Sequence, residues 1–254
     1  MGTNYIDFYL LHNPEYALLL KDGYKKIMNA FKILEKKRDE KKILYYGIAT
    51  WNGLRRLNNN KYQLNLNKII YDLEKDLGKN HGFRCLEAPL SIGMPDLLNY
   101  NNKNFFNLQN FLKKNKINFF SSASLYEGNL FELSELNKIY NSTLNRSDLP
   151  NEIYSASVSF PKSENSLRRL FILLENLKKN NIDFEKILLK IFKNKNIYGI
   201  AINLLKVLPF IKSSLIGMEE KKYVIYNLKE FEYRLNVRQK NYLKMFWNKI
   251  KKNL

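Results

Sequence analysis

Short apolar runs that do not alternate with polar residues constrain the fold of this chain more than any other feature of its sequence. The first two lie at 5–11 and 43–50, and a proline or a Trp-Asn-Gly turn soon follows each of them. Such a run is too short for a typical helix and suits a strand that is buried on both faces. Three more runs bring the predicted number of strands to five, at 84–93, 117–125 and 213–218.

The segments between these runs have the periodicity of helices. Apolar residues recur at spacings of three and four through 18–38, with lysines between them. That pattern is typical of an amphipathic helix that packs one face on a core. Strands separated by helices predict a parallel sheet of the α/β class. Four further helices are expected, at 105–115, 200–208, 219–232 and 237–252.

Two regions depart from this alternation within what we expect to be a single domain, 1–254. Residues 131–195 are longer than one βα step needs, and 167–179 reads as a helix, so we expect a helical insertion there. The C-terminal segment 233–254 contains a basic amphipathic helix. We expect its apolar stripe to dock on the body of the protein; the stripe consists of Leu243, Phe246, Trp247 and Ile250.

Composition excludes several classes of protein. Hydrophobic residues make up 45% of the chain, which indicates a folded protein and not a disordered one. Cys85 is the single cysteine, so no internal disulfide can form, and no Cys/His cluster predicts a metal site. No window approaches the roughly 18 apolar residues that a membrane span requires. We therefore expect a cytoplasmic protein without membrane association.

The formal charge of +19 raises the alternative of a basic nucleic-acid-binding module. Lysines are spread along the whole chain and mixed with asparagines, as in 58–61 and 99–107. A nucleic-acid site usually concentrates its lysines and arginines on one element. The distribution disfavours a nucleic-acid partner, and this module is kept as the alternative from another functional class.

Five blocks of the sequence resemble the strand ends of the aldo-keto reductases, in the same order and at roughly the same spacing. The blocks are GTNYIDFYLLHNPE, YYGIATWNG, EAPLSIGMP, SASLYEGNL and SLIGMEEKKYVIYNL, similar to the fourth to eighth strand ends of that family. The resemblance implies a (β/α)8 TIM barrel with its site at the carboxyl ends of the strands. This chain would be a partial barrel of about five C-terminal βα units, strands 4 to 8, with Met1 near the end of a third helix.

The resemblance also implies an activity, the NAD(P)H-dependent reduction of a small-molecule carbonyl to an alcohol. In the family a tyrosine donates the proton, assisted by a lysine and an aspartate, and all three lie on the first three βα units. His12 matches the residue that orients the carbonyl, and it is the one catalytic residue that carries over. Three interpretations stay open: a longer reductase that is truncated here, a noncatalytic remnant, and a half-barrel that needs a missing N-terminal half as its partner.

The family's nicotinamide contacts match four positions of this chain. Thr50 matches the polar residue that holds the carboxamide, and Trp51 belongs to the same turn. Glu87 stands where the family usually has glutamine, so that an amide donor is lost and an acceptor is kept. Ser122 stands at or near the position of the tyrosine that stacks on nicotinamide.

The remaining cofactor contacts implied by the resemblance follow the last two strands. They are Leu125 and Gly128 beside the pyrophosphate, then Gly217, Glu220 and Asn227, the last near the adenine. Relatives that prefer NADP often have Ser and Arg or Lys where this chain has glutamates, and a carboxylate repels the 2′-phosphate. NADP is expected from the resemblance, and NAD is the second candidate.

Overall fold

The computed structural model describes residues 2–54, 60–91, 94–99, 108–125 and 197–253. The chain divides into two compact units. The sheet unit comprises Met1–Pro89, Asp96–Ser122 and Phe210–Ser214, and the C-terminal unit comprises Leu90–Pro95, Ala123–Pro209 and Leu215–Leu254. The expected helical insertion at 131–195 lies outside the described residues, and the expectation of one domain stays a prediction. None of the described helices is long and apolar enough to cross a membrane.

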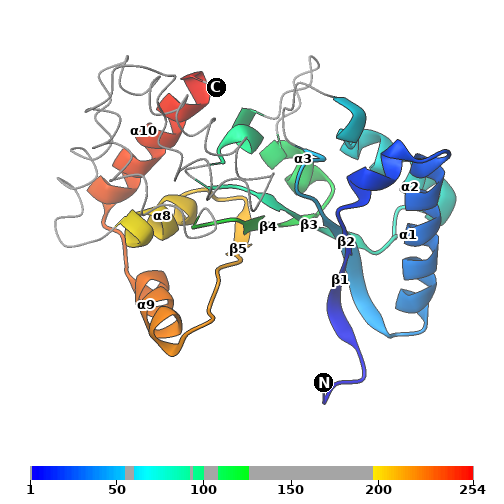
Figure 1. The fold of residues 1–254 in the computed structure, drawn as a ribbon, viewed down its shortest axis with the longest axis horizontal. Helices are drawn as coiled ribbons and strands as arrows, with labels where there is room; N and C mark the ends of the chain where they lie inside the picture. Colours follow the sequence, from blue (N-terminus) through cyan, green and yellow to red (C-terminus); the bar gives the residue numbers. More distant parts are fainter. Residues whose placement is uncertain (1, 55–59, 92–93, 100–107, 126–196, 254) are drawn as a thin grey trace, which may run out of the picture. The chain divides into compact units, whose positions relative to one another are not determined.

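Five parallel strands form the sheet, which confirms the predicted α/β class (Figure 1). The sheet is open, with β1 and β5 at its edges among the described residues. The last strand starts and ends earlier than its apolar run, because pairing with the short β4 sets its limits. In spatial order the strands are β1 (Ile6–His12), β2 (Ile43–Ala49), β3 (Phe83–Pro89), β4 (Asn118–Ser122) and β5 (Ile211–Ser214).

Among the described residues, three α-helices and three short 3-10 helices lie between β1 and β4. The first predicted helix, 18–38, begins later than expected, because the 3-10 helix η1 (Pro14–Leu19) precedes α1 (Gly23–Asp39). Helix α1 packs against β2, and α2 packs against α1 (Figure 1). The other elements are α2 (Leu66–Leu77), α3 (Leu108–Lys114), η2 (Asn60–Tyr62) and η3 (Asp96–Asn99).

Helix α2 was missing from the sequence prediction, which placed no helix between the runs at 43–50 and 84–93. Its signal is present: four buried apolar residues at helical spacing, and Asn65 as N-cap, whose side chain accepts the Lys68 N–H at 3.0 Å. The four residues are Leu66, Ile69, Ile70 and Leu73.

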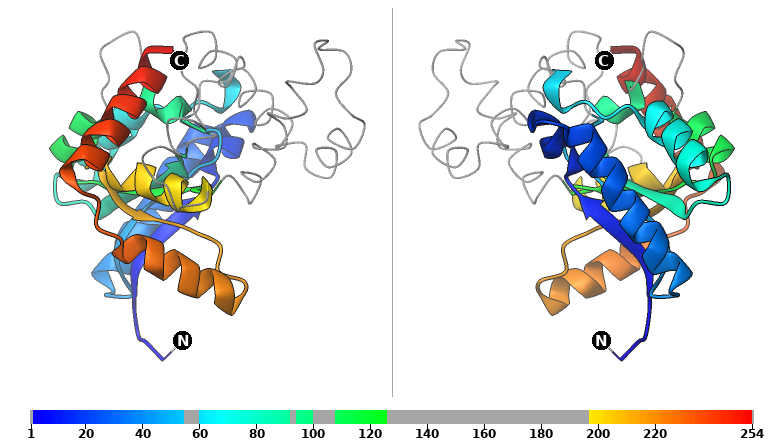
Figure 2. Two further views of the ribbon diagram at one scale, coloured as in Figure 1. Left: turned by 90° about the vertical axis from the view of Figure 1, so that its left-hand side faces the viewer. Right: turned by 90° about the vertical axis from the view of Figure 1, so that its right-hand side faces the viewer.

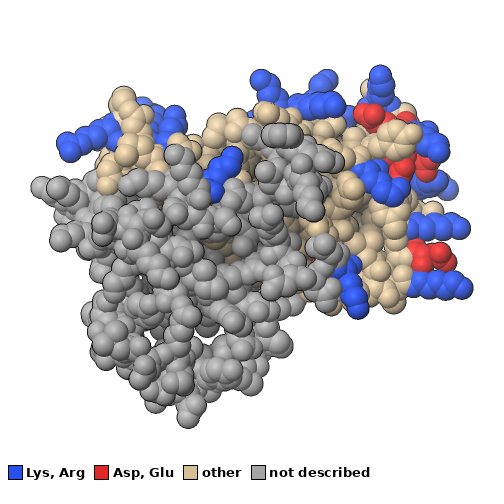
Figure 3. Space-filling view, turned by 90° about the horizontal axis from the view of Figure 1, so that it is seen from above, with Lys and Arg blue, Asp and Glu red and all other residues tan. Residues whose placement is uncertain are grey.

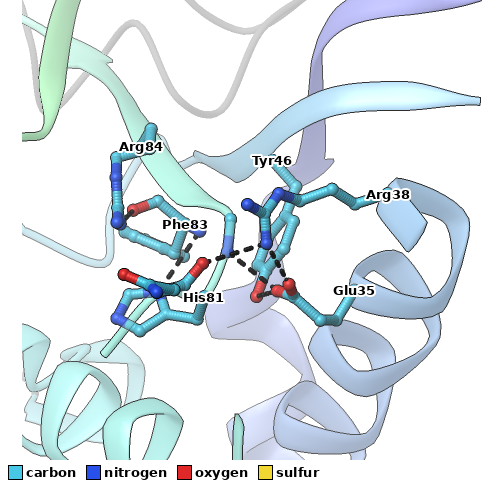
Figure 4. Close-up of polar contacts among 8 residues, drawn as sticks. Glu35, Arg38, Tyr46, His81, Phe83 and Arg84 are labelled. Atoms are coloured by element: carbon cyan, nitrogen blue, oxygen red, sulfur yellow. Dashed lines mark hydrogen bonds and ion pairs between the residues drawn. The ribbon is translucent and has the colours of Figure 1, made fainter. Parts of the chain in front are cut away.

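An aromatic and polar cluster attaches α1 to the middle of β2 and the amino-terminal end of β3. The Phe31 ring stacks on Tyr46 at 5.9 Å and meets Phe83 edge-on at 5.4 Å. The Tyr46 hydroxyl donates to Glu35 Oε2 at 2.6 Å, and the Gly82 N–H donates to the same oxygen at 2.8 Å (Figure 4). This cluster fixes the helix and leaves the carboxyl ends of the strands for other contacts.

The C-terminal unit contains α8 (Ile197–Lys206), α9 (Lys221–Glu232) and α10 (Val237–Asn253), all at positions that the sequence predicted. Helix α10 is one continuous helix that leads to the C-terminus (Figure 2). The stripe residues Leu243, Phe246 and Trp247 are buried, and the Trp247 indole N–H donates to the Leu204 carbonyl at 2.7 Å. Trp247 of the stripe therefore contacts α8 through this hydrogen bond, and the docking of the stripe as a whole stays a prediction.

Ion pairs compensate several of the described basic residues. Figure 3 shows acidic side chains among the basic ones on the face that it presents. Lys32 on α1 lies 2.8 Å from Asp76 on α2. Lys68 lies 2.7 Å from Asp72, one turn away on α2. Part of the excess charge in these helices is therefore balanced locally.

Candidate active site

The strand register places two of the sequence-predicted residues in one row at the carboxyl ends of the strands. His12 is the neighbour of Ala49 on β2, and Ala49 is the neighbour of Glu87 on β3. Register neighbours in a pleated sheet point to the same face. His12 and Glu87 therefore project on the same face, with only the methyl group of Ala49 between them.

Ser122 joins this face from β4. Glu87 is the register neighbour of Phe120, and Ser122 follows Phe120 by two residues, which returns it to the same face. A hydrogen bond from the Ser122 side chain reaches Glu87. The structure thus brings together three predicted site residues from β1, β3 and β4.

Burial is the main influence on the Glu87 carboxyl, and it raises the pKa of this group. The hydrogen bond from Ser122 and the charge of His12 act in the opposite direction and are weaker. A protonated carboxyl carries one O–H donor beside one carbonyl acceptor, which is the hydrogen-bonding pattern of an amide. A protonated Glu87 therefore keeps a hydrogen-bond donor like that of the glutamine usual at this position. Only the ionised form of Glu87 lacks this donor.

The turn after β1 is held against the turn after β2. Asn13 has a left-handed backbone with φ of 47°, and its N–H donates to the Ala49 carbonyl at 2.6 Å. Its side-chain oxygen accepts the Trp51 N–H at 3.0 Å, and its Nδ2 lies 3.4 Å from His12 Nε2. His12 is exposed at the end of its strand, beside this fixed turn.

Glu15 is a site residue that the sequence analysis missed. It is fully buried, and its carboxylate accepts three hydrogen bonds from the turn after β2: the Thr50 hydroxyl at 2.7 Å, the Trp51 N–H at 3.0 Å and the Asn52 N–H at 2.8 Å. An acidic residue after a proline reads as an ordinary first-turn residue of a helix. Its partners lie 35 to 37 positions away in sequence, so that no local pattern reveals them.

Thr50 is held from two sides. Its hydroxyl donates to Glu15 and accepts the Gly53 N–H at 2.9 Å. The turn tolerates no side chain at residue 53, because a Cβ on Gly53 would lie 2.5 Å from the Thr50 oxygen. The Gly53 carbonyl in turn accepts the Leu64 N–H at 2.8 Å. Thr50 is thereby fixed beside Trp51, which is partly exposed.

The other predicted cofactor residues belong to the C-terminal unit. Asn227 is buried, and its side chain donates to the Gly217 carbonyl at 3.3 Å, which closes the loop before α9. Glu220 is the N-cap of α9, and its carboxylate lies 2.8 Å from the Lys222 ammonium. This exposed pair balances the charge of the Glu220 carboxylate. Leu125 is partly exposed, and Gly128 lies outside the described residues.

No protein-family model and no curated protein matches the sequence. Among solved structures the chain is similar to Tm1743, a thermostable aldo-keto reductase solved in complex with the inhibitor epalrestat, with 17% identity and a TM-score of 0.52. The match covers 96% of this chain and 60% of that one. The chain has an aldo-keto reductase fold.

A second aldo-keto reductase is also similar, AKR11C1 from Bacillus halodurans in its holo form, with 14% identity and a TM-score of 0.48. The match covers 96% of this chain and 61% of that one. The chain thus spans about 60% of the length of the aldo-keto reductases that it matches. Its open five-stranded sheet agrees with part of a barrel of this fold.

Proposed function

We propose that this chain forms the part of an NAD(P)H-dependent aldo-keto reductase that orients the carbonyl substrate and receives the nicotinamide ring. The observation that supports this proposal most is the shared row of His12 and Glu87 at the carboxyl ends of β1 and β3, where barrels of this class place their chemistry. In the proposed enzyme, His12 orients the substrate carbonyl by a hydrogen bond. The proton donor comes from βα units other than those described.

The residues at the nicotinamide end suit the proposed cofactor. Thr50 is fixed at the end of β2 by two hydrogen bonds, and Glu87 and Ser122 form a hydrogen-bonding pair on β3 and β4. Thr50 and Glu87 would hold the carboxamide, while Ser122 and Trp51 would lie beside the ring. The cofactor supplies the hydride, and these residues fix the orientation of the ring toward the carbonyl.

The loop before α9 is proposed to hold the adenine end of the dinucleotide through Gly217, Glu220 and Asn227. Leu125 and Gly128 would flank the pyrophosphate. The Lys222 ammonium near Glu220 makes NADP and NAD both suitable cofactors.

The test is to titrate the purified chain with NADPH and with NADH by fluorescence and to assay the reduction of a reactive aldehyde. We expect dinucleotide binding without turnover. Turnover requires a positioned proton donor, and general acid catalysis typically contributes about 10²- to 10⁴-fold. Thr50→Val should weaken binding, whereas His12→Ala should leave binding intact, because His12 is assigned to the substrate.

Two results would contradict the proposal. Robust turnover that disappears in His12→Ala would mean that the proton donor lies within these residues. Tight binding of nucleic acid without dinucleotide binding would favour the basic module instead, and its affinity would fall steeply with salt.

A further inference from the structure

The hydrogen-bonding capacity of the Thr50 hydroxyl is nearly used up within the protein. A threonine hydroxyl has one hydrogen to donate and two lone pairs to accept with. Its hydrogen goes to Glu15 Oε2 at 2.7 Å, and one lone pair accepts the Gly53 N–H at 2.9 Å. One lone pair is left, so that any ligand group that meets this oxygen must be a hydrogen-bond donor.

The direction of the bond between Thr50 and Glu15 is fixed by the surroundings of the carboxylate. Glu15 is fully buried, and its Oε1 already accepts the N–H groups of Trp51 at 3.0 Å and Asn52 at 2.8 Å. A carboxylate has no hydrogen to give, so the threonine must be the donor. Rotation of the hydroxyl toward a ligand would leave a buried carboxylate oxygen without a partner, and this is costly.

We propose that Glu15 is a positioning residue that makes Thr50 a pure acceptor and thereby sets which end of the nicotinamide carboxamide Thr50 binds. Thr50 then recognises the amide NH₂ and not the amide oxygen. The chain selects cofactors with a 3-carboxamide over analogues that carry a carbonyl without an N–H donor. This inference rests on the proposed function and adds a residue and a specificity to it.

Reduced 3-acetylpyridine adenine dinucleotide tests the inference directly. This analogue of NADH keeps the carbonyl oxygen and replaces the NH₂ by a methyl group. One hydrogen bond typically contributes about 0.5–1.5 kcal/mol, which corresponds to roughly 2- to 13-fold in affinity. Isothermal titration calorimetry of the wild-type chain should give a weaker affinity for the analogue by a factor in this range.

Glu15→Gln should abolish this preference without changing the size of the side chain. The amide oxygen that this substitution introduces can keep the N–H groups of Trp51 and Asn52, while the amide NH₂ faces Thr50 and donates to it. The hydroxyl hydrogen is then released to donate to the carbonyl oxygen, which both nucleotides share. We expect the two affinities to become equal within about twofold. The hydrogen bond that only NADH can form, from its amide NH₂ to Thr50, is replaced by a hydrogen bond to the carbonyl oxygen that both nucleotides can form.

Three controls separate this effect from damage to the fold. Thr50→Val should also abolish the preference while Glu15 stays in place, which keeps the test valid if Glu15→Gln unfolds. Glu40→Gln, at an exposed glutamate that follows α1, should keep the wild-type preference. ADP-ribose lacks the nicotinamide, so that its affinity should be the same in every variant whose thermal unfolding is normal.

The outcomes distinguish a failure of this inference from a failure of the proposed function. Equal binding of both nucleotides by the wild type would overturn the inference and leave the proposed function intact, as would a preference that survives Glu15→Gln. Dinucleotides that bind no more tightly than ADP-ribose would overturn the assignment of Thr50 to the carboxamide. No binding of any of the three ligands would overturn the proposed function, and this inference with it.

Discussion

Replacing Glu35 by alanine is expected to destabilise the sheet unit more than the replacement of any exposed acidic residue of α1. The Glu35 carboxylate accepts hydrogen bonds from the Tyr46 hydroxyl at 2.6 Å and from the Gly82 N–H at 2.8 Å, and it pairs with Arg38 (Figure 4). Tyr46 is fully buried, and Gly82 is buried as well. Alanine would leave both donors without an acceptor.

The size of this effect follows from the two buried donors. Each unsatisfied donor costs about 1–3 kcal/mol, so that their sum is about 2–6 kcal/mol. The Glu35 side chain keeps 13% exposure, and water can enter part of the space that it vacates. We therefore expect a loss of about 2–4 kcal/mol. Arg38 adds little, because its guanidinium keeps the Asn80 carbonyl as an acceptor at 2.9 Å.

Urea denaturation followed by circular dichroism at pH 7 measures the loss. Tyr46→Phe removes the hydroxyl, so the double variant should lose less stability than the two single variants together. The control is Glu40→Ala at the end of α1, where Glu40 pairs with Lys37 on the surface. That exposed pair should contribute almost nothing to stability.

The same side chain gives a pH dependence of known sign. Burial acts to raise the pKa of Glu35, but the hydrogen bonds from Tyr46, Gly82 and Arg38 together outweigh burial and lower it. A folded-state pKa below the unfolded value gives a stabilisation that is complete above the unfolded pKa and is lost as the pH falls through the folded pKa. The difference between wild type and Glu35→Gln should therefore shrink toward pH 3. Strictly additive losses, or a loss no larger than that of Glu40→Ala, would refute the reasoning.

Three further predictions concern the strands. Burial raises the pKa of Glu87, so Glu87→Gln should stabilise the fold at pH 7 to 8, with a gain that vanishes below the unfolded pKa of the carboxyl; a loss of stability in urea at pH 8 would contradict this. Burial raises the pKa of Cys85 to about 12, so its thiol should react with a thiol reagent at pH 8 only after denaturation, and rapid labelling of the native chain would count against the structure. Gly47→Ala should prevent folding, because a Cβ there would lie 1.8 Å from the Cys85 carbonyl oxygen; a soluble variant with native circular dichroism would disprove it.

The sequence by itself determined the class of the fold. β1 to β4 are recognisable as short, mostly apolar runs, and the helices between them require parallel strands. The expectation that the first run is buried on both faces was wrong: β1 is an edge strand of the described sheet, and all of its residues are exposed or partly exposed. The residues at which the helices and strands begin and end were harder to predict from the sequence. The start of α1 depends on close packing at Gly23, where a Cβ would lie 1.8 Å from the Ala17 carbonyl oxygen, and the ends of β5 depend on its pairing with β4.

Sequence and resemblance together named His12, Thr50 and Glu87, but not what surrounds them. The tertiary structure alone decided that the Glu15 carboxylate holds the Thr50 hydroxyl, because hydrogen bonds between residues 35 positions apart leave no periodic trace in a sequence. It also decided the protonation preference of Glu87, which is a property of its burial and of its neighbours and not of the residue itself. The carboxyl ends of parallel strands meet at one edge of the sheet, and only there do these distant side chains acquire their partners.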